Sequence, residues 1–288
     1  MPDLSLDEVE VRRATLDLFL TQSGQLIDAQ PDEPPSDSPF AIEARHFVRP
    51  QSVDNVLGLT SLLVESAADE IQSFLRLTEP PVQSKSPLTC VRASLESSAL
   101  AAWLLAPDIE ASDRVKRSLA YFYEGLIQKR KLYREKQLSQ TIVSPEVGSI
   151  DQLIDQLQSL ASQMGLAPVL DKKTQTKRTG VGVAFPKISE LIDQELGQIE
   201  TYRLLSAAAH SHMWAITELT FSKSSEATKP GYRTLEKGLS TLTWEYLSVK
   251  SLLAFSIVLR HRFAYLGWDK AALESLLQSL SRELGHTL

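Results

Sequence analysis

The strongest constraint on the fold is the spacing of apolar residues, which recur every three or four positions along most of the chain. This spacing places the side chains of each set along one face of an α-helix. The clearest sets are Val56, Leu59, Leu63, Ala67, Ile71 and Phe74; Val115, Leu119, Phe122, Leu126 and Tyr133; Ile150, Leu153, Ile154, Leu157 and Leu160; and Leu273, Leu276, Leu277, Leu280 and Leu284. The best strand candidate, Val181–Phe185, is short and is bounded by glycine and proline. The sequence therefore predicts an all-α protein, a multi-helix bundle.

Local signals predict where several helices begin and end. Ser149 and Gln152 have the spacing of a capping box, and Gly165 and Gly285 stand where helices would end. The segment 235–259 is apolar on more than one side. We therefore expect a central helix there that packs against several neighbours.

A proline- and acid-rich segment, residues 30–39, divides the chain. Such a composition is typical of linkers rather than of helices. The predicted division is an acidic N-terminal helical arm over 1–29, a linker over 30–50, and one helical domain over 51–288. Within that domain, residues 168–186 are expected to form a long, mobile loop.

Composition argues against several classes of protein. The 288 residues include one cysteine, Cys90, which rules out a disulfide framework or a cysteine zinc cluster. The longest apolar run, Ala99–Ala106, is far shorter than the roughly 20 residues of a membrane span. The N-terminus is acidic and polar, unlike a signal peptide. We therefore expect no membrane association and a cytoplasmic location.

Familiar motifs for cofactor binding do not occur either. The five histidines form neither H-x-x-x-H nor H-E-x-x-H, and the glycines give no phosphate-binding loop, so no metal or other cofactor is expected. Cys90 stands at an expected helix start beside Arg92, a setting that would lower the pKa of its thiol. A buried, structural cysteine is the favoured interpretation, since unpaired cysteines are usually buried.

Charge is distributed unevenly along the chain, whose formal net charge is −6. Residues 1–45 contain ten acidic and three basic side chains, whereas residues 111–140 contain eight basic and three acidic ones. Basic clusters can contact phosphates. Two other interpretations stay open: a solvated helix face, or a basic face that the acidic N-terminal arm covers.

The segment Tyr202–His212, YRLLSAAAHSH, carries the one chemically suggestive pattern. Arg203 and His210 are seven residues apart, nearly two helical turns, so their side chains share one face about 10 Å apart along the axis. Ser206 shares that face, and Tyr202 flanks it. A guanidinium binds a phosphate bidentately, and a histidine moves protons near neutral pH. Together they suit metal-free cleavage of RNA, by attack of a 2′-oxygen on the adjacent phosphate.

The pattern R-x(4–6)-H on a helix of an all-α protein resembles the HEPN superfamily of ribonucleases and RNA-binding proteins. Arg203 and His210, with six residues between them, fit the longest spacing. The chain is also similar to uncharacterised bacterial helical proteins of HEPN type in two further sets: Arg92 with Glu96, and Tyr202 with Ser206 and His210. The resemblance implies a metal-independent endoribonuclease or RNA-binding protein, often a toxin or defence effector. It also implies a homodimer in which the two Arg/His helices face each other.

On this resemblance, Arg203 would bind the phosphate and His210 would be the acid/base. Leu204 is a departure, because active members usually carry a polar residue directly after the arginine. Glu96 is expected to orient Arg203 or His210, with an ordinary intrahelical ion pair to Arg92 as the alternative. Nine basic side chains are candidates for contacts with the RNA backbone: Arg114, Lys116, Arg117, Lys129, Arg130, Arg134, Lys172, Lys173 and Arg178.

The alternative function is a non-catalytic helical scaffold, or an antitoxin-like protein that binds a protein partner. In that case the polar face of the Tyr202–His212 helix is an internal hydrogen-bond network. His210 would bond a buried carbonyl or carboxylate, and Arg203 would pair with Glu200 or Glu96.

Overall fold

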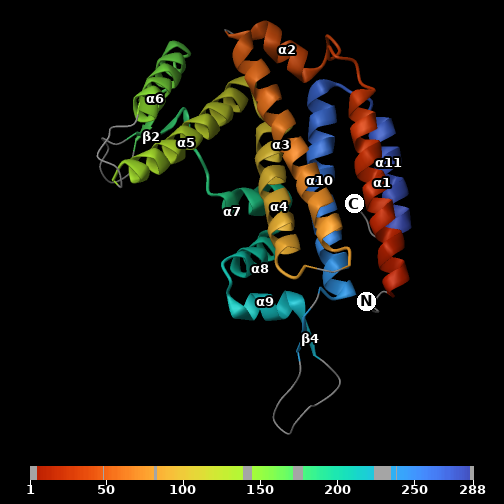
Figure 1. Ribbon diagram of the computed structural model, residues 1–288. Coiled ribbons are helices and arrows are strands. Elements are labelled where there is room, and N and C mark those ends of the chain that lie inside the picture. The colour runs from red at the N-terminus through yellow and green to blue at the C-terminus, as the bar shows by residue number, and fades with distance from the viewer. Residues whose placement is uncertain are drawn as a thin grey trace. The chain divides into compact units, whose positions relative to one another are not determined.

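Helices make up nearly all the regular structure in the computed structural model of the chain (Figure 1). The structure describes residues 5–47, 49–80, 83–138, 145–170, 178–223, 235–237 and 239–285. The helices are α1 (Leu6–Asp28), α2 (Pro39–His46), α3 (Pro50–Leu77), α4 (Ser86–Leu105), α5 (Ala111–Leu138), α6 (Pro145–Gln163), α7 (Ile188–Leu191), the π-helical turn η1 (Ile192–Leu196), α8 (Ile199–Ala209), α9 (Met213–Thr220), α10 (Thr241–Leu266) and α11 (Lys270–Leu284). The strands are β1 (Pro168–Leu170), β2 (Arg178–Val181), β3 (Val183–Ala184), β4 (Phe221–Lys223) and β5 (Leu235–Lys237). The predicted all-α, multi-helix bundle is confirmed.

The chain forms two compact units. The larger comprises Met1–Ala41, Thr60–Pro107 and Ile188–Leu288, and the smaller comprises Ile42–Leu59 and Asp108–Lys187. This division differs from the one expected from composition, since the N-terminal helix belongs to the larger unit instead of forming a separate arm.

The N-terminal helix α1 packs along α11 and also contacts α10 (Figure 1). Its start is fixed by a reciprocal capping box: the Ser5 hydroxyl accepts from the Glu8 amide, and the Glu8 carboxylate accepts from the Ser5 amide. Phe19 of α1 packs edge-on against Phe255 of α10, with ring centroids 6.4 Å apart. The buried apolar positions of α1 therefore make it part of the core.

The helix α10 is the centre of the larger unit and packs most extensively against α4. It is long and apolar enough to cross a membrane by length and composition alone, but most of it is buried inside the protein, as in the core helix of a soluble fold. A central helix was therefore predicted correctly, but it spans 241–266 instead of 235–259. Ser240 caps the helix by accepting from the Thr243 amide, which sets its start at Thr241.

The end of α10 depends on a close approach between two segments. Gly267 adopts a left-handed conformation with φ of 67°, and a Cβ there would lie 2.8 Å from the Cβ of Ser38. Only glycine meets both demands, so it stops the helix and admits the neighbouring chain.

In the smaller unit, α5 packs against α6 and against the strand β2. The strands β1, β2 and β3 form an antiparallel sheet in that order, with Val169 opposite Gly180. The expected loop over 168–186 therefore contains strands at both ends, while residues 171–177 lie outside the described part. The predicted strand Val181–Phe185 is interrupted at Gly182, whose φ of 68° makes the turn between β2 and β3.

Of the predicted helix ends, Gly285 is confirmed as a left-handed cap of α11, and Gly165 follows α6 closely with φ of 71°. The predicted capping box at Ser149 and Gln152 is wrong, because α6 already begins at Pro145. Proline at a first helical position leaves no amide to satisfy, and this provides an alternative start.

Candidate functional site

The predicted Arg/His helix is α8, and it ends one residue before His210. The His210 amide still donates to the Ser206 carbonyl at 3.0 Å, so His210 remains one turn along the helix from Ser206. Ser211 then takes a left-handed φ of 62°, rare for a residue other than glycine, and α9 begins two residues later. His210 is thus a helix cap instead of the interior helical residue that the sequence indicated.

Arg203 and His210 are both exposed. The residues that α8 buries are Thr201, Leu205 and Ala208, which lie on the opposite side of the helix. No hydrogen bond or ion pair joins the side chain of Arg203 or His210 to any residue that the structure describes. The alternative, in which both side chains belong to an internal hydrogen-bond network, therefore does not hold among the described residues.

Of the other four predicted polar residues, Ser206 is half-buried on α8 and the remaining three form a separate cluster between α4 and α8. Glu96 accepts from the Arg92 Nε at 2.9 Å and from the Tyr202 hydroxyl at 3.0 Å. The Arg92 guanidinium also lies over the Tyr202 ring, 5.5 Å from its centroid. The cluster joins α8 to α4, and its polar groups meet part of one another's need for hydrogen bonds.

The electrostatics of this cluster follow from the shared Glu96 carboxylate. Burial lowers the pKa of the Arg92 guanidinium, but Glu96 and Tyr202 together outweigh burial and hold that pKa above its usual value. Burial first, and then the charge of Glu96, raise the pKa of the Tyr202 phenol. Both groups therefore keep their protons through the neutral range.

Glu96 has a different role from the expected one. It bonds Arg92 and Tyr202, and among the described residues it makes no hydrogen bond to Arg203 or His210. The intrahelical pair with Arg92, left open as the alternative, is present, and Tyr202 extends it across two helices.

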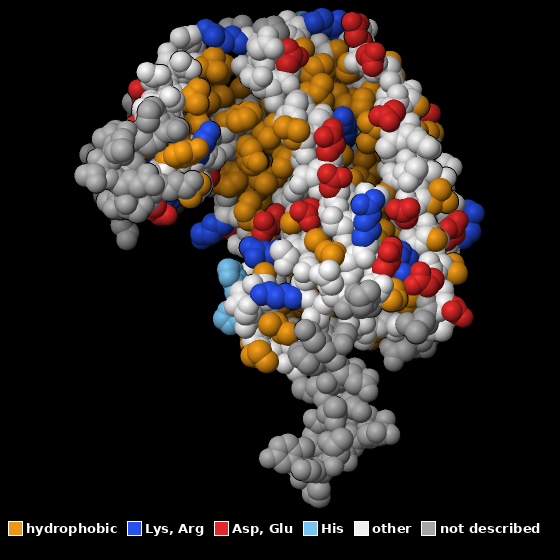
Figure 2. All heavy atoms as spheres, viewed as in Figure 1, with side chains coloured by type: hydrophobic (Ala, Val, Ile, Leu, Met, Phe, Trp, Pro, Cys, Tyr) orange, Lys and Arg blue, Asp and Glu red, His pale blue; other side chains and the backbone are white. Residues whose placement is uncertain are grey.

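Lys85 joins the Arg/His edge, although nothing in the sequence marks it. Its ammonium donates to the Ser211 hydroxyl at 2.7 Å, which places a cation next to His210. Met213 and Trp214 follow at the start of α9, with 68% and 59% of their surfaces exposed. Figure 2 shows pale-blue histidines, Lys or Arg and hydrophobic side chains together where Figure 1 places α8 and α9. Lys85 and Ser211 are 126 residues apart in sequence, so only tertiary folding brings them together.

Arg114 is a wrong prediction among the expected phosphate contacts. The residue is 2% exposed, its Nε lies 3.3 Å from the Glu43 carboxylate, and its Nη2 lies 3.4 Å from the Ile109 carbonyl. A phosphate cannot reach a guanidinium that is enclosed in this way. Glu43 belongs to the acidic segment 1–45, so a residue of that segment does neutralise a basic residue of 111–140. The pair lies in the interior of the smaller unit and not on a basic surface.

The remaining basic residues of α5 differ in availability. Lys116 pairs with Asp113 at 2.6 Å, and Arg130 pairs with Asp151 at 3.0 Å. Arg117 is half-buried and has an interaction partner, whereas Lys129 and Arg134 are exposed. Of the three basic candidates that lie after α6, Lys172 and Lys173 lie outside the described residues, and Arg178 lies in β2 with its side chain not described.

Cys90 was expected to be a buried, structural cysteine; it is less buried than that, but its thiol has the raised pKa of an unreactive group. It is half-buried in the second turn of α4, and burial, followed by the nearby Glu70 carboxylate, raises the pKa of its thiol to about 11. The lowering expected from a helix start and Arg92 is therefore reversed. In the part of the chain that the structure describes, no group of three or more His, Cys, Asp and Glu could hold a metal ion.

The structure thus separates the predicted site residues into two sets. Arg203 and His210 share an exposed edge with Lys85 close to His210, while Arg92, Glu96 and Tyr202 form an anchoring cluster. Comparison of the chain with protein-family models, curated proteins and solved structures gave no significant match.

Proposed function

We propose that this protein is a HEPN-like RNA-binding protein that cleaves RNA at the exposed edge of α8 without a metal ion. The observation that carries the proposal is the pair of Arg203 and His210. Both side chains are exposed on one helix, and neither has a hydrogen-bond or ion-pair partner among the described residues. A guanidinium and an imidazole that are reachable from solvent are suited to a polyanion.

In the proposed reaction, Arg203 binds the non-bridging oxygens of a phosphate and offsets the charge that develops there. His210 accepts the proton of the neighbouring 2′-hydroxyl while its oxygen forms a bond to phosphorus. The bond from phosphorus to the 5′-oxygen breaks, and that oxygen takes a proton from water. The products are a 2′,3′-cyclic phosphate and a 5′-hydroxyl.

The other residues have supporting roles in this proposal. Lys85, placed beside His210 by its bond to Ser211, contacts an adjacent phosphate. The cluster of Arg92, Glu96 and Tyr202 holds α8 against α4 and so fixes the direction of Arg203. The protein acts as a homodimer, with its two Arg/His edges facing each other, as the resemblance implies. Its location in this proposal is the cytoplasm, as expected from the polar N-terminus.

A second candidate is a partner-binding scaffold of antitoxin-like type. The observation that favours it is the exposure of Met213 and Trp214 beside the same edge. Exposed aromatic and methionine side chains are enriched where proteins bind one another.

Incubation of the purified protein with a mixed RNA pool in EDTA separates the two functions. Cleavage by the wild-type chain, its loss in His210→Ala, and its retention in His212→Ala would support the nuclease. His212 is a matched control because it is an exposed histidine only two residues away. Intact RNA in every lane, with no change in the anisotropy of labelled RNA, would overturn the proposal and favour the scaffold.

A further inference from the structure

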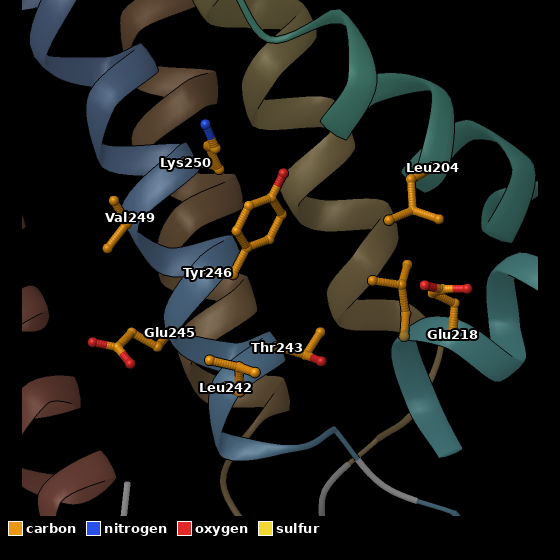
Figure 3. Close-up of a pocket in the computed structure, with 9 residues that line it drawn as sticks. Leu204, Glu218, Leu242, Thr243, Glu245, Tyr246, Val249 and Lys250 are labelled. Carbon is orange, nitrogen blue, oxygen red and sulfur yellow. The ribbon is translucent and has the colours of Figure 1, made fainter. Parts of the chain in front are cut away.

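A cavity of about 420 Å³ lies between α8, α9 and α10, within the larger unit (Figure 3). Small-molecule sites generally have volumes of roughly 300–1,000 Å³ and mostly apolar walls with a few polar groups. The lining residues are Leu204, Glu218, Leu219, Leu242, Thr243, Glu245, Tyr246, Val249 and Lys250. The cavity therefore has the size and composition of a ligand site, and it is separate from Arg203 and His210.

Part of the apolar wall of the cavity is an exposed face of α10, a helix that is mostly buried elsewhere. Leu242 and Tyr246 of α10 are 42% and 40% exposed, and Val249 continues the same face one turn further on. Leu204 of α8 and Leu219 of α9 complete this wall. Filling the space would remove this apolar surface from water, which favours binding of an apolar molecule.

Four residues place polar groups at the cavity: Lys250, Tyr246, Thr243 and Glu218. Lys250 is half-buried, and its ammonium lies 5.6 Å from the centroid of the Tyr246 ring. The Tyr246 hydroxyl is already hydrogen-bonded to Thr201 at 2.6 Å. Thr243 adds a hydroxyl, and Glu218 lies across the cavity from Lys250 (Figure 3).

The balance of charge decides which head group the site accepts. Glu245 is 3% exposed, its carboxylate points away from Leu204 and Glu218, and it pairs with Arg12, so it adds no net charge (Figure 3). Glu218 is exposed, and water screens its field. Lys250 is partly shielded from water and makes no ion pair with a described residue, so its charge acts more strongly on a ligand.

We infer that this cavity binds a small amphipathic molecule with an apolar body and a carboxylate head. The body lies against Leu204, Leu219, Leu242 and Val249, and the head contacts the ammonium of Lys250. Leu204 thereby gains a role at the position where active HEPN proteins usually carry a polar residue. The inference does not depend on RNA binding, which is assigned to Arg203 and His210, and neither of these residues lines the cavity.

The test is isothermal titration of the full-length protein with decanoate, decanol and decylamine, all below their micelle concentrations. The three probes share one chain and differ in the charge of the head. Decanoate should bind, and the two others should bind about tenfold more weakly, since a charge-assisted contact contributes about that factor. Tighter binding of decylamine would show that Glu218, and not Lys250, sets the charge preference of the cavity, and it would overturn the inference.

Variants test the assigned residues. Lys250→Met keeps the apolar stem and should remove the preference for decanoate over decanol, whereas Lys270→Met, on an exposed lysine of α11, should leave it unchanged. Leu204→Trp should fill the cavity and abolish binding of all three probes, with thermal unfolding measured to confirm that the variant is folded. No binding by the wild-type chain, or an unchanged decanoate affinity in Lys250→Met, would also overturn the inference.

Discussion

Arg114 and Arg203 are both arginines for which the sequence predicts a phosphate partner, yet the two units give them opposite environments. Arg114 is buried on α5 beside Glu43, whereas Arg203 is exposed on α8 and makes no ion pair with a described residue. The comparison teaches that a basic run does not by itself identify a binding surface. The position of each side chain relative to the buried face of its helix decides whether it is available.

The helix positions explain the difference. Arg114 directly precedes the buried Val115 and lies four residues before the buried Ser118, so it stands at the border of the inward face of α5. A guanidinium held there must find an acceptor within the protein, because burying an unpaired charge is very costly. Arg203 lies on the side of α8 opposite Leu205 and faces water, where no such acceptor is required.

The largest effect on stability is expected from Arg114→Ala. It should lower the free energy of unfolding by about 3 kcal/mol, because it removes the guanidinium that neutralises the mostly buried Glu43. Urea denaturation followed by circular dichroism measures this loss. Arg134→Ala, on an exposed arginine of the same helix, should change stability by less than about 0.5 kcal/mol. Equal effects of the two variants would remove the distinction between buried and exposed arginines.

A smaller effect is expected from Tyr202→Phe in the anchoring cluster. The variant keeps the ring but loses the hydrogen bond to Glu96, which should cost about 1 kcal/mol. The same urea titration measures it. RNA cleavage should persist, because this residue positions α8 and does not contact the phosphate. Full loss of cleavage at unchanged stability would show that Tyr202 takes part in the reaction.

Almost no effect on stability is expected from Arg203→Ala, because its side chain makes no hydrogen bond or ion pair within the described residues. Its unfolding free energy should stay within about 0.5 kcal/mol of the wild-type value. RNA affinity should fall, and the slope of log affinity against log salt should decrease by about 1, as for the loss of one phosphate contact. An unchanged slope would mean that RNA binds elsewhere.

The comparison of buried with exposed groups can also be made for the Cys90 thiol, and this test needs only the wild-type chain. Because burial and Glu70 raise its pKa to about 11, the thiol stays protonated at pH 8 and should react only slowly with iodoacetamide. The rate should then increase about tenfold per pH unit up to about pH 10, as the thiolate fraction rises. Mass spectrometry of the alkylated chain measures the rate, and a plateau below pH 9 would contradict the raised pKa.

Helices were the most predictable part of the fold. The apolar stripes at 56–74, 115–133, 150–160 and 273–284 all lie in helices, and Gly285 ends the last of them. Helix ends with two competing local signals were less predictable. The capping box at Ser149 was overridden by a start at Pro145, and α8 stops before His210 because Ser211 turns into a left-handed conformation.

The candidate site was predictable only in part. The spacing of Arg203 and His210 indicated a shared face, and both are exposed together. The pairing of Arg92 with Glu96 was also visible, since an acid four residues after a base is a local pattern. Lys85 and the third partner of the cluster, Tyr202, were not assigned correctly, because their contacts join distant segments.

By itself, the sequence determined which segments are helical and which face of each one is apolar. Helical hydrogen bonds and side-chain stripes connect residues three or four positions apart, so that information is local. Only the tertiary structure decided which charged groups are enclosed, as with Arg114 and Glu43, and where a cavity remains between α8, α9 and α10. The physical reason is that desolvation and pairing depend on neighbours far away in the chain, which packing alone brings within contact distance.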